Sequence, residues 1–257
     1  MRKLFKEHFP NKSMILQIDK VTKNFGGLVA LKDVCISLRE KGVYGLIGPN
    51  GSGKTTLFNC ISGIYRPTSG SIFFNGKNIV GLKPHQICRL GIGRTFQITR
   101  PFLGMTVLEN VMVGSIFGRG ASVSYEEARS RAEYCIDLLK LSNRKNSLVG
   151  NLTLSERKIV EIAKALASQP KLLLLDEVAA GLNPTEVLEI AKLIRRIAED
   201  LGITVFWVEH VMKAIMSYAD YIFVLNEGMK IAEGIPQEVA NNTRVIESYL
   251  GKMLVKG

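Results

Sequence analysis

Apolar and polar residues alternate through the first forty positions of the chain, most clearly in the stretches ILQIDKV and VCISL. A period of two is typical of strands with one buried face, so this part predicts antiparallel strands. The stretch GVYGLI (42–47) is nearly all apolar and predicts a short buried strand, with a helix from Lys54 to about Ile64 after it. Asn75-Gly76, between SIFF and KNI, predicts a hairpin turn.

From about Thr106 to Ala167 strand patterns disappear and helical periodicity takes over, as in SYEEARSRAEYCIDLLKL. Beyond it, apolar stretches such as KLLLLD, ITVFWV, YIFVLN and KIAEG alternate with helical ones such as PTEVLEIAKLIRRIAEDL and VMKAIMSYA. Alternation of this kind predicts a parallel sheet flanked by helices. The chain is therefore predicted to be an α/β protein whose core is interrupted by a helical insert.

Composition changes this picture little. The 46% of hydrophobic and 22% of charged residues are ordinary for a globular protein, and the net charge of +11 suggests an anionic partner such as a nucleotide, nucleic acid or membrane surface. The four cysteines form no CxxC pair, which argues against a zinc site and fits a reducing compartment. The start lacks the apolar core of a signal peptide, and no apolar run reaches the roughly 20 residues of a membrane span. We expect a soluble, cytoplasmic chain.

The clearest chemical motif is GPNGSGKTT (48–56), which matches GxxxxGK[ST]. It lies between an apolar strand and a helix, the context that a phosphate-binding loop requires. Backbone N–H groups of such a loop close on the β-phosphate, and the helix N-terminus adds positive potential. We expect Lys54 to reach the β- and γ-phosphates and the Thr55 hydroxyl to bind Mg²⁺.

A second motif is the acidic pair that ends the stretch KLLLLDE (171–177). At the end of a buried strand, Asp176 can hold the water shell of Mg²⁺, and Glu177 can polarise an attacking water as a general base. No NKxD motif for reading guanine is present, which counts against a GTPase.

With these two motifs the chain resembles the nucleotide-binding subunits of ABC transporters. The resemblance implies that Gln97, in GRTFQ, touches Mg²⁺ and the attacking water, and that His210, in WVEH, contacts the γ-phosphate. It also implies that Phe25, in KNFGG, stacks on adenine, although a Phe near a strand end is more often part of the core. The loop AAGLNP, after Glu177, corresponds to the place where the two subunits of a dimer meet.

Finer resemblance points to one branch. The stretches GRTFQITRPFLGMTVLENVMVG, AAGLNPTE, EHVMKAIMSYADYIFVLNEGMKIAEG and RVIESYLG look like the ATPase subunits of branched-chain amino acid importers, and the likeness runs from about residue 15 to 251. Related urea, amide and lipopolysaccharide systems share much of this pattern.

The family's cross-subunit capping motif, usually LSGGQ, is here LTLSE (152–156). Thr153 keeps a hydroxyl and forms with Glu156 the pattern of a capping box, so a helix should begin here. Leu154 and Ser155 replace two glycines, which crowds the approach to a ligand. The charge of Glu156 suits the helix dipole but repels a phosphate. A further departure is Val178, where the family has proline.

The resemblance implies one ABC nucleotide-binding domain over 1–257. It would comprise a RecA-like P-loop NTPase core (about 14–99 and 168–235) with an N-terminal antiparallel β-subdomain, an inserted α-helical subdomain (about 100–167) and a C-terminal helical tail (236–257). The predicted catalytic residues are Glu177, His210 and Gln97, and the predicted metal ligands are Thr55, Gln97 and Asp176. The predicted nucleotide-binding residues are Phe25, Gly48, Asn50, Gly51, Ser52, Gly53, Lys54, Thr55 and Thr56. The degenerate capping residues are Thr153, Ser155 and Glu156.

The resulting hypothesis is an Mg²⁺-dependent ATPase on the inner face of the cell membrane that powers an importer of branched-chain or other amino acids. Its partners would be transmembrane permease subunits and a second ATPase subunit, in a homodimer or, as the degenerate capping motif favours, a heterodimer, with no nucleic acid. Two alternatives stay open: a regulatory nucleotide-binding subunit with weak turnover, and a soluble ABC ATPase acting on nucleic acid or ribosomes.

Overall fold

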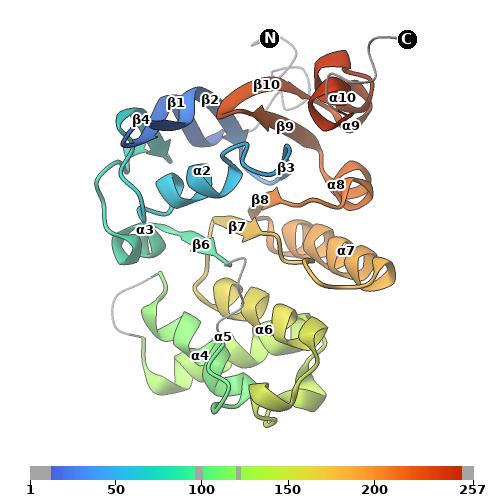
Figure 1. Ribbon diagram of the computed structural model, residues 1–257. Helices are drawn as coiled ribbons and strands as arrows, with labels where there is room; N and C mark the ends of the chain where they lie inside the picture. Colours follow the sequence, from blue (N-terminus) through green and yellow to red (C-terminus); the bar gives the residue numbers. More distant parts are fainter. Residues whose placement is uncertain (1–12, 96–100, 120–122, 251–257) are drawn as a thin grey trace.

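The computed structural model describes residues 13–95, 101–119 and 123–250. Two sheets and the helices around them form the upper part of the molecule in Figure 1, and a group of helices hangs below the larger sheet. The helices are α2 (Lys54–Ile61), α3 (Pro84–Leu90), α4 (Val107–Phe117), α5 (Tyr125–Leu138), α6 (Leu154–Ala167), α7 (Pro184–Leu201), α8 (Met212–Tyr218), α9 (Pro236–Ala240) and α10 (Thr243–Leu250), with short 3-10 turns η1 (Ser142–Arg144) and η2 (Val149–Asn151).

The smaller sheet is antiparallel, as its alternating sequence predicts. Its order is β2-β1-β4-β5, and its strands are β1 (Met14–Phe25), β2 (Leu28–Arg39), β4 (Ser69–Phe74) and β5 (Lys77–Asn78). Asn75 and Gly76 join β4 to β5 with φ of 47° and 76°, the left-handed conformation of a two-residue hairpin turn. The predicted hairpin is therefore confirmed.

The larger sheet has the order β10-β9-β3-β8-β7-β6. Its strands are β3 (Val43–Ile47), β6 (Ile92–Arg94), β7 (Leu172–Asp176), β8 (Thr204–Val208), β9 (Tyr221–Asn226) and β10 (Met229–Gly234). Five strands are parallel, as predicted, but β10 pairs antiparallel with β9. The prediction was wrong for KIAEG because Glu227 and Gly228, with φ of 48° and 75°, make a tight turn that sends the chain straight back.

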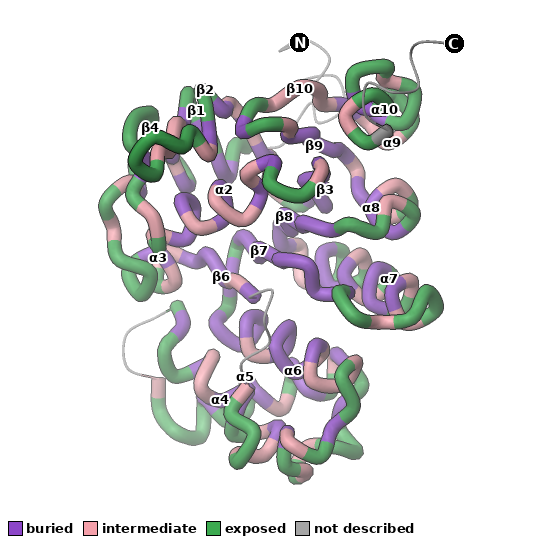
Figure 2. Tube along the Cα trace, viewed as in Figure 1, coloured by how far each residue is buried: buried purple, intermediate pink, exposed green. Residues whose placement is uncertain are grey.

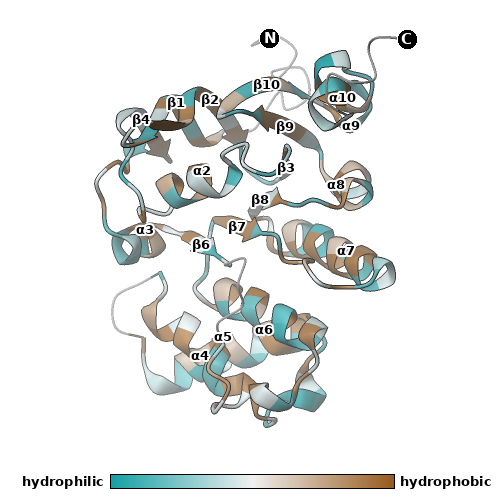
Figure 3. Ribbon diagram, viewed as in Figure 1, coloured by the Kyte–Doolittle hydropathy of each residue, from teal (hydrophilic) through white to brown (hydrophobic). Residues whose placement is uncertain are grey.

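Successive side chains of the parallel strands point to opposite faces of the sheet and enter two different cores. In β7, Leu172 and Leu174 pack with α2 and the antiparallel sheet, whereas Leu173 and Leu175 pack with α6, α7 and α8. Figure 2 shows the central strands buried throughout, and Figure 3 shows the corresponding hydrophobic colouring, with α7 hydrophobic along one side. Burial on both faces explains why these strands are continuously apolar rather than alternating.

Helices α4, α5 and α6 pack together where the sequence predicts helices rather than strands. Among the described residues of this region, the strand-like pairing is an isolated bridge between Thr106 and Leu148. Within the described residues, no helix combines the length and the hydrophobicity needed to cross a membrane.

Candidate nucleotide site

The loop of residues 48–53 joins β3 to α2, and its path depends on glycine at both ends. Gly48 has φ of 150°, and a Cβ there would lie 2.1 Å from the carbonyl oxygen of Leu225. Gly53, with φ of 100°, is the N-cap of α2, and a Cβ there would lie 2.7 Å from the carbonyl oxygen of Ala30. A larger residue at either position would therefore force the loop out of place.

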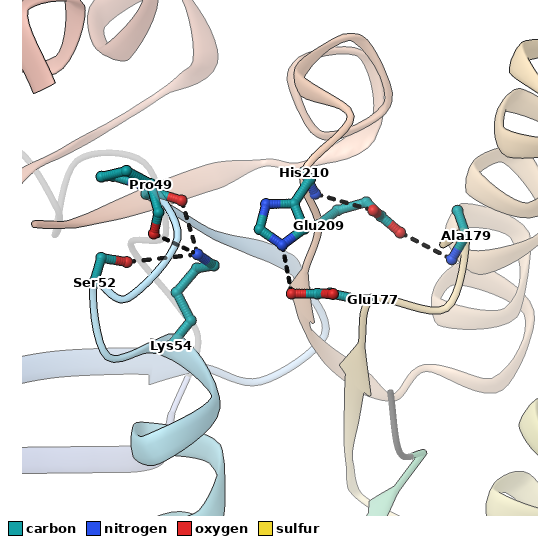
Figure 4. Close-up of polar contacts among 8 residues, drawn as sticks. Pro49, Ser52, Lys54, Glu177, Ala179, Glu209 and His210 are labelled. Carbon is teal, nitrogen blue, oxygen red and sulfur yellow. Dashed lines mark hydrogen bonds and ion pairs between the residues drawn. The ribbon is translucent and has the colours of Figure 1, made fainter. Parts of the chain in front are cut away.

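Helix α2 begins without a side-chain cap. The N–H groups of its first turn consequently remain available to an anion, and the helix dipole adds to their attraction. Lys54 lies at the same point, with Nζ 2.7 Å from the Gly48 carbonyl oxygen and 3.0 Å from that of Pro49 (Figure 4). Burial lowers the pKa of Lys54, while Glu177 and Asp176 raise it.

A cleft of about 1050 Å³ opens above this loop. Glu177 and His210 come from the ends of two strands of the large sheet and line it too. The phosphate-loop residues that line the cleft are Asn50, Gly51, Ser52, Gly53, Lys54, Thr55 and Thr56, whereas Gly48 is not part of the lining and lies beside Leu225. The structure thus gathers residues from distant parts of the sequence in one cleft.

Phe25 lines the same cleft at the end of β1 and is 41% exposed. The Lys23 ammonium lies 4.9 Å from its ring centroid, and the Tyr65 ring meets it edge-on at 5.1 Å. Phe25 is therefore a surface residue whose ring is held by Lys23 and Tyr65, rather than a core residue, and a planar aromatic ligand could stack on it.

The candidate base Glu177 and the candidate switch residue His210 are in contact. Nε2 of His210 lies 2.5 Å from Oε1 of Glu177, and the Glu177 side chain is 8% exposed against 40% for His210 (Figure 4). Glu177 has φ of 50°, an uncommon backbone conformation for a residue other than glycine. Its N–H donates to the Val208 carbonyl at 2.9 Å, which ties the turn to β8.

Asp176 is 1% exposed and forms an ion pair of 2.9 Å with Arg94 through Oδ2. Burial raises its pKa, and the negative charge of Glu177 raises it further, whereas Arg94 lowers it. Its other oxygen, Oδ1, is buried and has no hydrogen-bond partner in the described part of the chain. An orphaned carboxylate oxygen fits a bound cation or its water shell.

The described residues contain no group of three or more His, Cys, Asp or Glu that could hold a metal by itself. An Mg²⁺ ion would need oxygen ligands from a nucleotide as well, which is how this ion is commonly bound. The third predicted ligand, Gln97, lies outside the described residues.

The degenerate capping residues do not line this cleft. Thr153 is the N-cap of α6: its Oγ1 accepts the Glu156 N–H at 3.2 Å, and the Glu156 carboxylate accepts the Thr153 N–H at 2.9 Å. The predicted capping box is confirmed. Arg144 also donates to the Glu156 carboxylate at 2.9 Å. That ion pair offsets part of the negative charge of Glu156, which the sequence predicts to repel a phosphate.

Two residues at the site were missed from sequence. Arg94 bonds Asp176 but is separated from it by 82 residues, so no local pattern indicates the pair. Glu209 stands directly before His210 and bridges two backbone N–H groups, of His210 and Ala179. The acid in WVEH was a visible signal, but its partner Ala179 is 30 residues away.

Comparison with known proteins defines the class. A family model for the ABC transporter family matches residues 31–180, more than half of the chain. The chain belongs to this family and is an ABC-type, ATP-binding ATPase with a P-loop fold. A second model, for the branched-chain amino acid ATP-binding cassette transporter, matches residues 229–253.

Individual relatives agree. The chain is 39% identical to the high-affinity branched-chain amino acid transport ATP-binding protein LivG of Salmonella typhimurium over 250 residues, 93% of this chain and 98% of the relative. It is 40% identical to a probable LivG of Archaeoglobus fulgidus over 248 residues, 92% of this chain and 95% of the relative. A nucleotide-free ATP-binding cassette from an ABC transporter superposes with a TM-score of 0.86 at 33% identity, covering 93% of this chain and 100% of that one.

Proposed function

We propose that this chain hydrolyses ATP to power an importer of branched-chain amino acids. One observation carries the proposal: a single cleft combines an uncapped helix N-terminus and Lys54 with the paired side chains of Glu177 and His210. The amino acid substrate is supported by the names of the relatives and by the family model that matches residues 229–253.

The phosphates of ATP would bind at the N-terminus of α2. Lys54 would exchange its contacts with the Gly48 and Pro49 carbonyls for phosphate oxygens, which are stronger, charge-assisted partners. Glu177 would polarise the attacking water as a general base, and its contact with His210 would hold its carboxylate toward the cleft. Phe25 would stack on the adenine.

The residues proposed to hold Mg²⁺ are Thr55, Asp176 and Gln97. When bound, the ion would neutralise charge on the β- and γ-phosphate oxygens. Asp176 suits this role because its Oδ1 is buried without a partner among the described residues, and the ion pair of 2.9 Å with Arg94 orients its other oxygen.

We further propose that the chain works at the inner face of the membrane, pairs with a different ATPase subunit and contacts permease subunits through helices α4–α6. Pairing with a different ATPase subunit, called the unequal pair below, is supported by the residues at the start of α6. Thr153 and Glu156 are engaged with each other, and Leu154, 45% exposed, occupies a position where the family has glycine. In such a pair the partner would cap the nucleotide held by this chain, and LTLSE would form the weaker second site.

The same observation favours the second candidate, a regulatory subunit with weak turnover. Specific ATPase activity of the purified chain over a wide concentration range separates the two. Activity that climbs with concentration indicates self-pairing with a working LTLSE. Tight ATP binding without turnover, followed by full activity on adding the partner ATPase, supports the unequal pair. Absence of turnover even in the assembled transporter supports the regulatory role. The nucleic-acid alternative receives no support, since the relatives are named as transport proteins.

Uptake of radiolabelled leucine tests the proposed transport. Cells in which the chain is replaced by Glu177→Gln should lose leucine uptake to the level of a deletion strain, while lysine uptake stays unchanged. Retention of leucine uptake in the deletion strain would refute the proposed substrate.

A further inference from the structure

A buried carboxylate, Glu209, follows strand β8 and has no part in the hydrolysis proposed above. The residue is only 2% exposed, and each of its oxygens accepts a backbone N–H. Oε1 accepts from Ala179 at 2.9 Å and Oε2 accepts from His210 at 3.0 Å (Figure 4). A carboxylate is costly to bury, so its presence here calls for a reason beyond packing.

The two hydrogen bonds of Glu209 connect the segments that carry the two candidate catalytic side chains. Ala179 lies two residues after Glu177, and His210 follows Glu209 directly. The side chains of Glu177 and His210 then meet at 2.5 Å. The result is a closed ring of contacts in which one carboxylate fixes the separation of the two backbones.

Glu177 needs such support because of its own backbone. Its φ of 50° is uncommon outside glycine and persists only where the surroundings hold it. Two hydrogen bonds to the end of β8 hold this conformation: the Glu177 N–H donates to the Val208 carbonyl, and the Ala179 N–H donates to the Glu209 carboxylate. Loss of the hydrogen bond between Ala179 and Glu209 would let the turn relax and would move the Glu177 carboxylate.

A buried ammonium faces the same carboxylates from helix α6. Lys158 is 5% exposed and interacts electrostatically with Glu161, Glu209 and Glu177, which together oppose the lowering of its pKa by burial. It supplies positive charge beside two carboxylates that would otherwise repel each other. The helix that begins with the capping box thus also contributes to the surroundings of Glu209.

We propose that Glu209 is a positioning residue for ATP hydrolysis, which holds Glu177 and His210 in register by bonding the backbones of both segments at once. The proposal rests on the ATPase function proposed above. It predicts that Glu209 affects the chemical step and not the binding of ATP, because the two hydrogen bonds that its carboxylate accepts within the described residues come from Ala179 and His210 rather than from the phosphate loop.

The test is Glu209→Gln in the full chain, assembled with its partner subunits. Glutamine has the same size but one acceptor oxygen, and its NH₂ group would face one of the two backbone N–H donors. We expect kcat to fall by about tenfold or more, since a displacement of 1 Å can cost on the order of 10²-fold. The KM for ATP should change less than about twofold, because an interaction used only in the transition state lowers kcat and kcat/KM alike.

Two further variants separate positioning from a general structural effect. Asp220→Asn is the matched control: Asp220 also accepts a backbone N–H, from Val43 at 2.8 Å, but at the opposite end of the strands, where β3 and β9 begin. It should lower stability and leave kcat unchanged. In a His210→Ala background, Glu209→Gln should have a much smaller effect than in the wild type, because the two residues act through one contact. Additive losses would contradict the proposal.

A readout that needs no turnover is the ¹⁵N chemical shift of His210 Nε2. In Glu209→Gln it should move toward the value seen in Glu177→Ala, where the partner is absent. An unchanged shift, or a kcat equal to that of the wild type, would overturn the role of Glu209 while leaving the ATPase intact. Failure of the wild-type complex to hydrolyse ATP would instead refute the proposed function, and the shift would still decide whether Glu209 positions His210.

Discussion

The ion pair between Arg94 and Asp176 gives the sharpest prediction about stability at the site. The side chains are 6% and 1% exposed and 2.9 Å apart, and Arg94 also donates to Asn59 at 2.8 Å and to Ser62 at 2.6 Å. Arg94→Met keeps most of the side-chain length but leaves the carboxylate buried without its counter-charge. Breaking a buried pair from one side costs about 3–5 kcal/mol, and we expect a loss of this size in the free energy of unfolding.

Urea unfolding at constant m measures this loss. Arg129→Met is the matched control, because it breaks an exposed pair with Glu133 (46% and 33% exposed) and should lower the free energy of unfolding far less than Arg94→Met does. The double variant Arg94→Met, Asp176→Leu should recover part of the loss, since it removes the stranded charge as well. If Arg94→Met costs no more than the control, the argument from burial is wrong.

Three other predictions concern the cleft and its surroundings. Phe25→Ala should weaken ATP binding by about 1–3 kcal/mol, the usual worth of a ring stacked on a base, while Phe25→Tyr binds as the wild type does; calorimetry on both variants checks this. Replacing residues 154–156 by Gly-Gly-Gln should raise ATPase activity at the second site by about tenfold or more, since one lost donor costs about 10²–10³ in rate, and an unchanged rate in an otherwise active complex would count against the unequal pair. Burial raises the pKa of Glu209, so the folded protein binds the proton of this carboxyl more tightly than the unfolded chain does. The resulting contribution to the free energy of unfolding is fully present below the ordinary glutamate pKa of about 4.3 and is lost as the pH rises through the raised pKa. Urea titrations should therefore show that the free energy of unfolding of Glu209→Gln rises relative to that of the wild type as the pH increases from about 4.3 toward neutrality. A difference in this free energy that does not depend on pH would contradict the predicted sign.

The elements that could be predicted from sequence are those whose determinants are contiguous. The phosphate loop, the hairpin at Asn75-Gly76 and the capping box of Thr153 and Glu156 each depend on residues a few positions apart. Their backbone conformations follow from glycine, asparagine and short side-chain contacts, and the structure shows them where they were expected.

The features that could not be predicted depend on contacts across the sheet. Arg94 meets Asp176 because β6 and β7 are neighbours, and Glu209 meets Ala179 because the loop after β7 folds over the end of β8. The antiparallel direction of β10 was missed for another reason. The Glu227-Gly228 turn was visible in the sequence, but the alternation around it was interpreted as a continuing parallel sheet.

Release of inorganic phosphate from ATP tests the central claim most directly. The chain is assembled with its partner subunits, and the rate at saturating ATP is compared with that of Glu177→Gln, with nucleotide binding measured in the same samples. We predict that the variant binds ATP as tightly as the wild type and loses the share of turnover due to this chain. Equal rates in the two complexes, or no release by the wild type, would contradict the account.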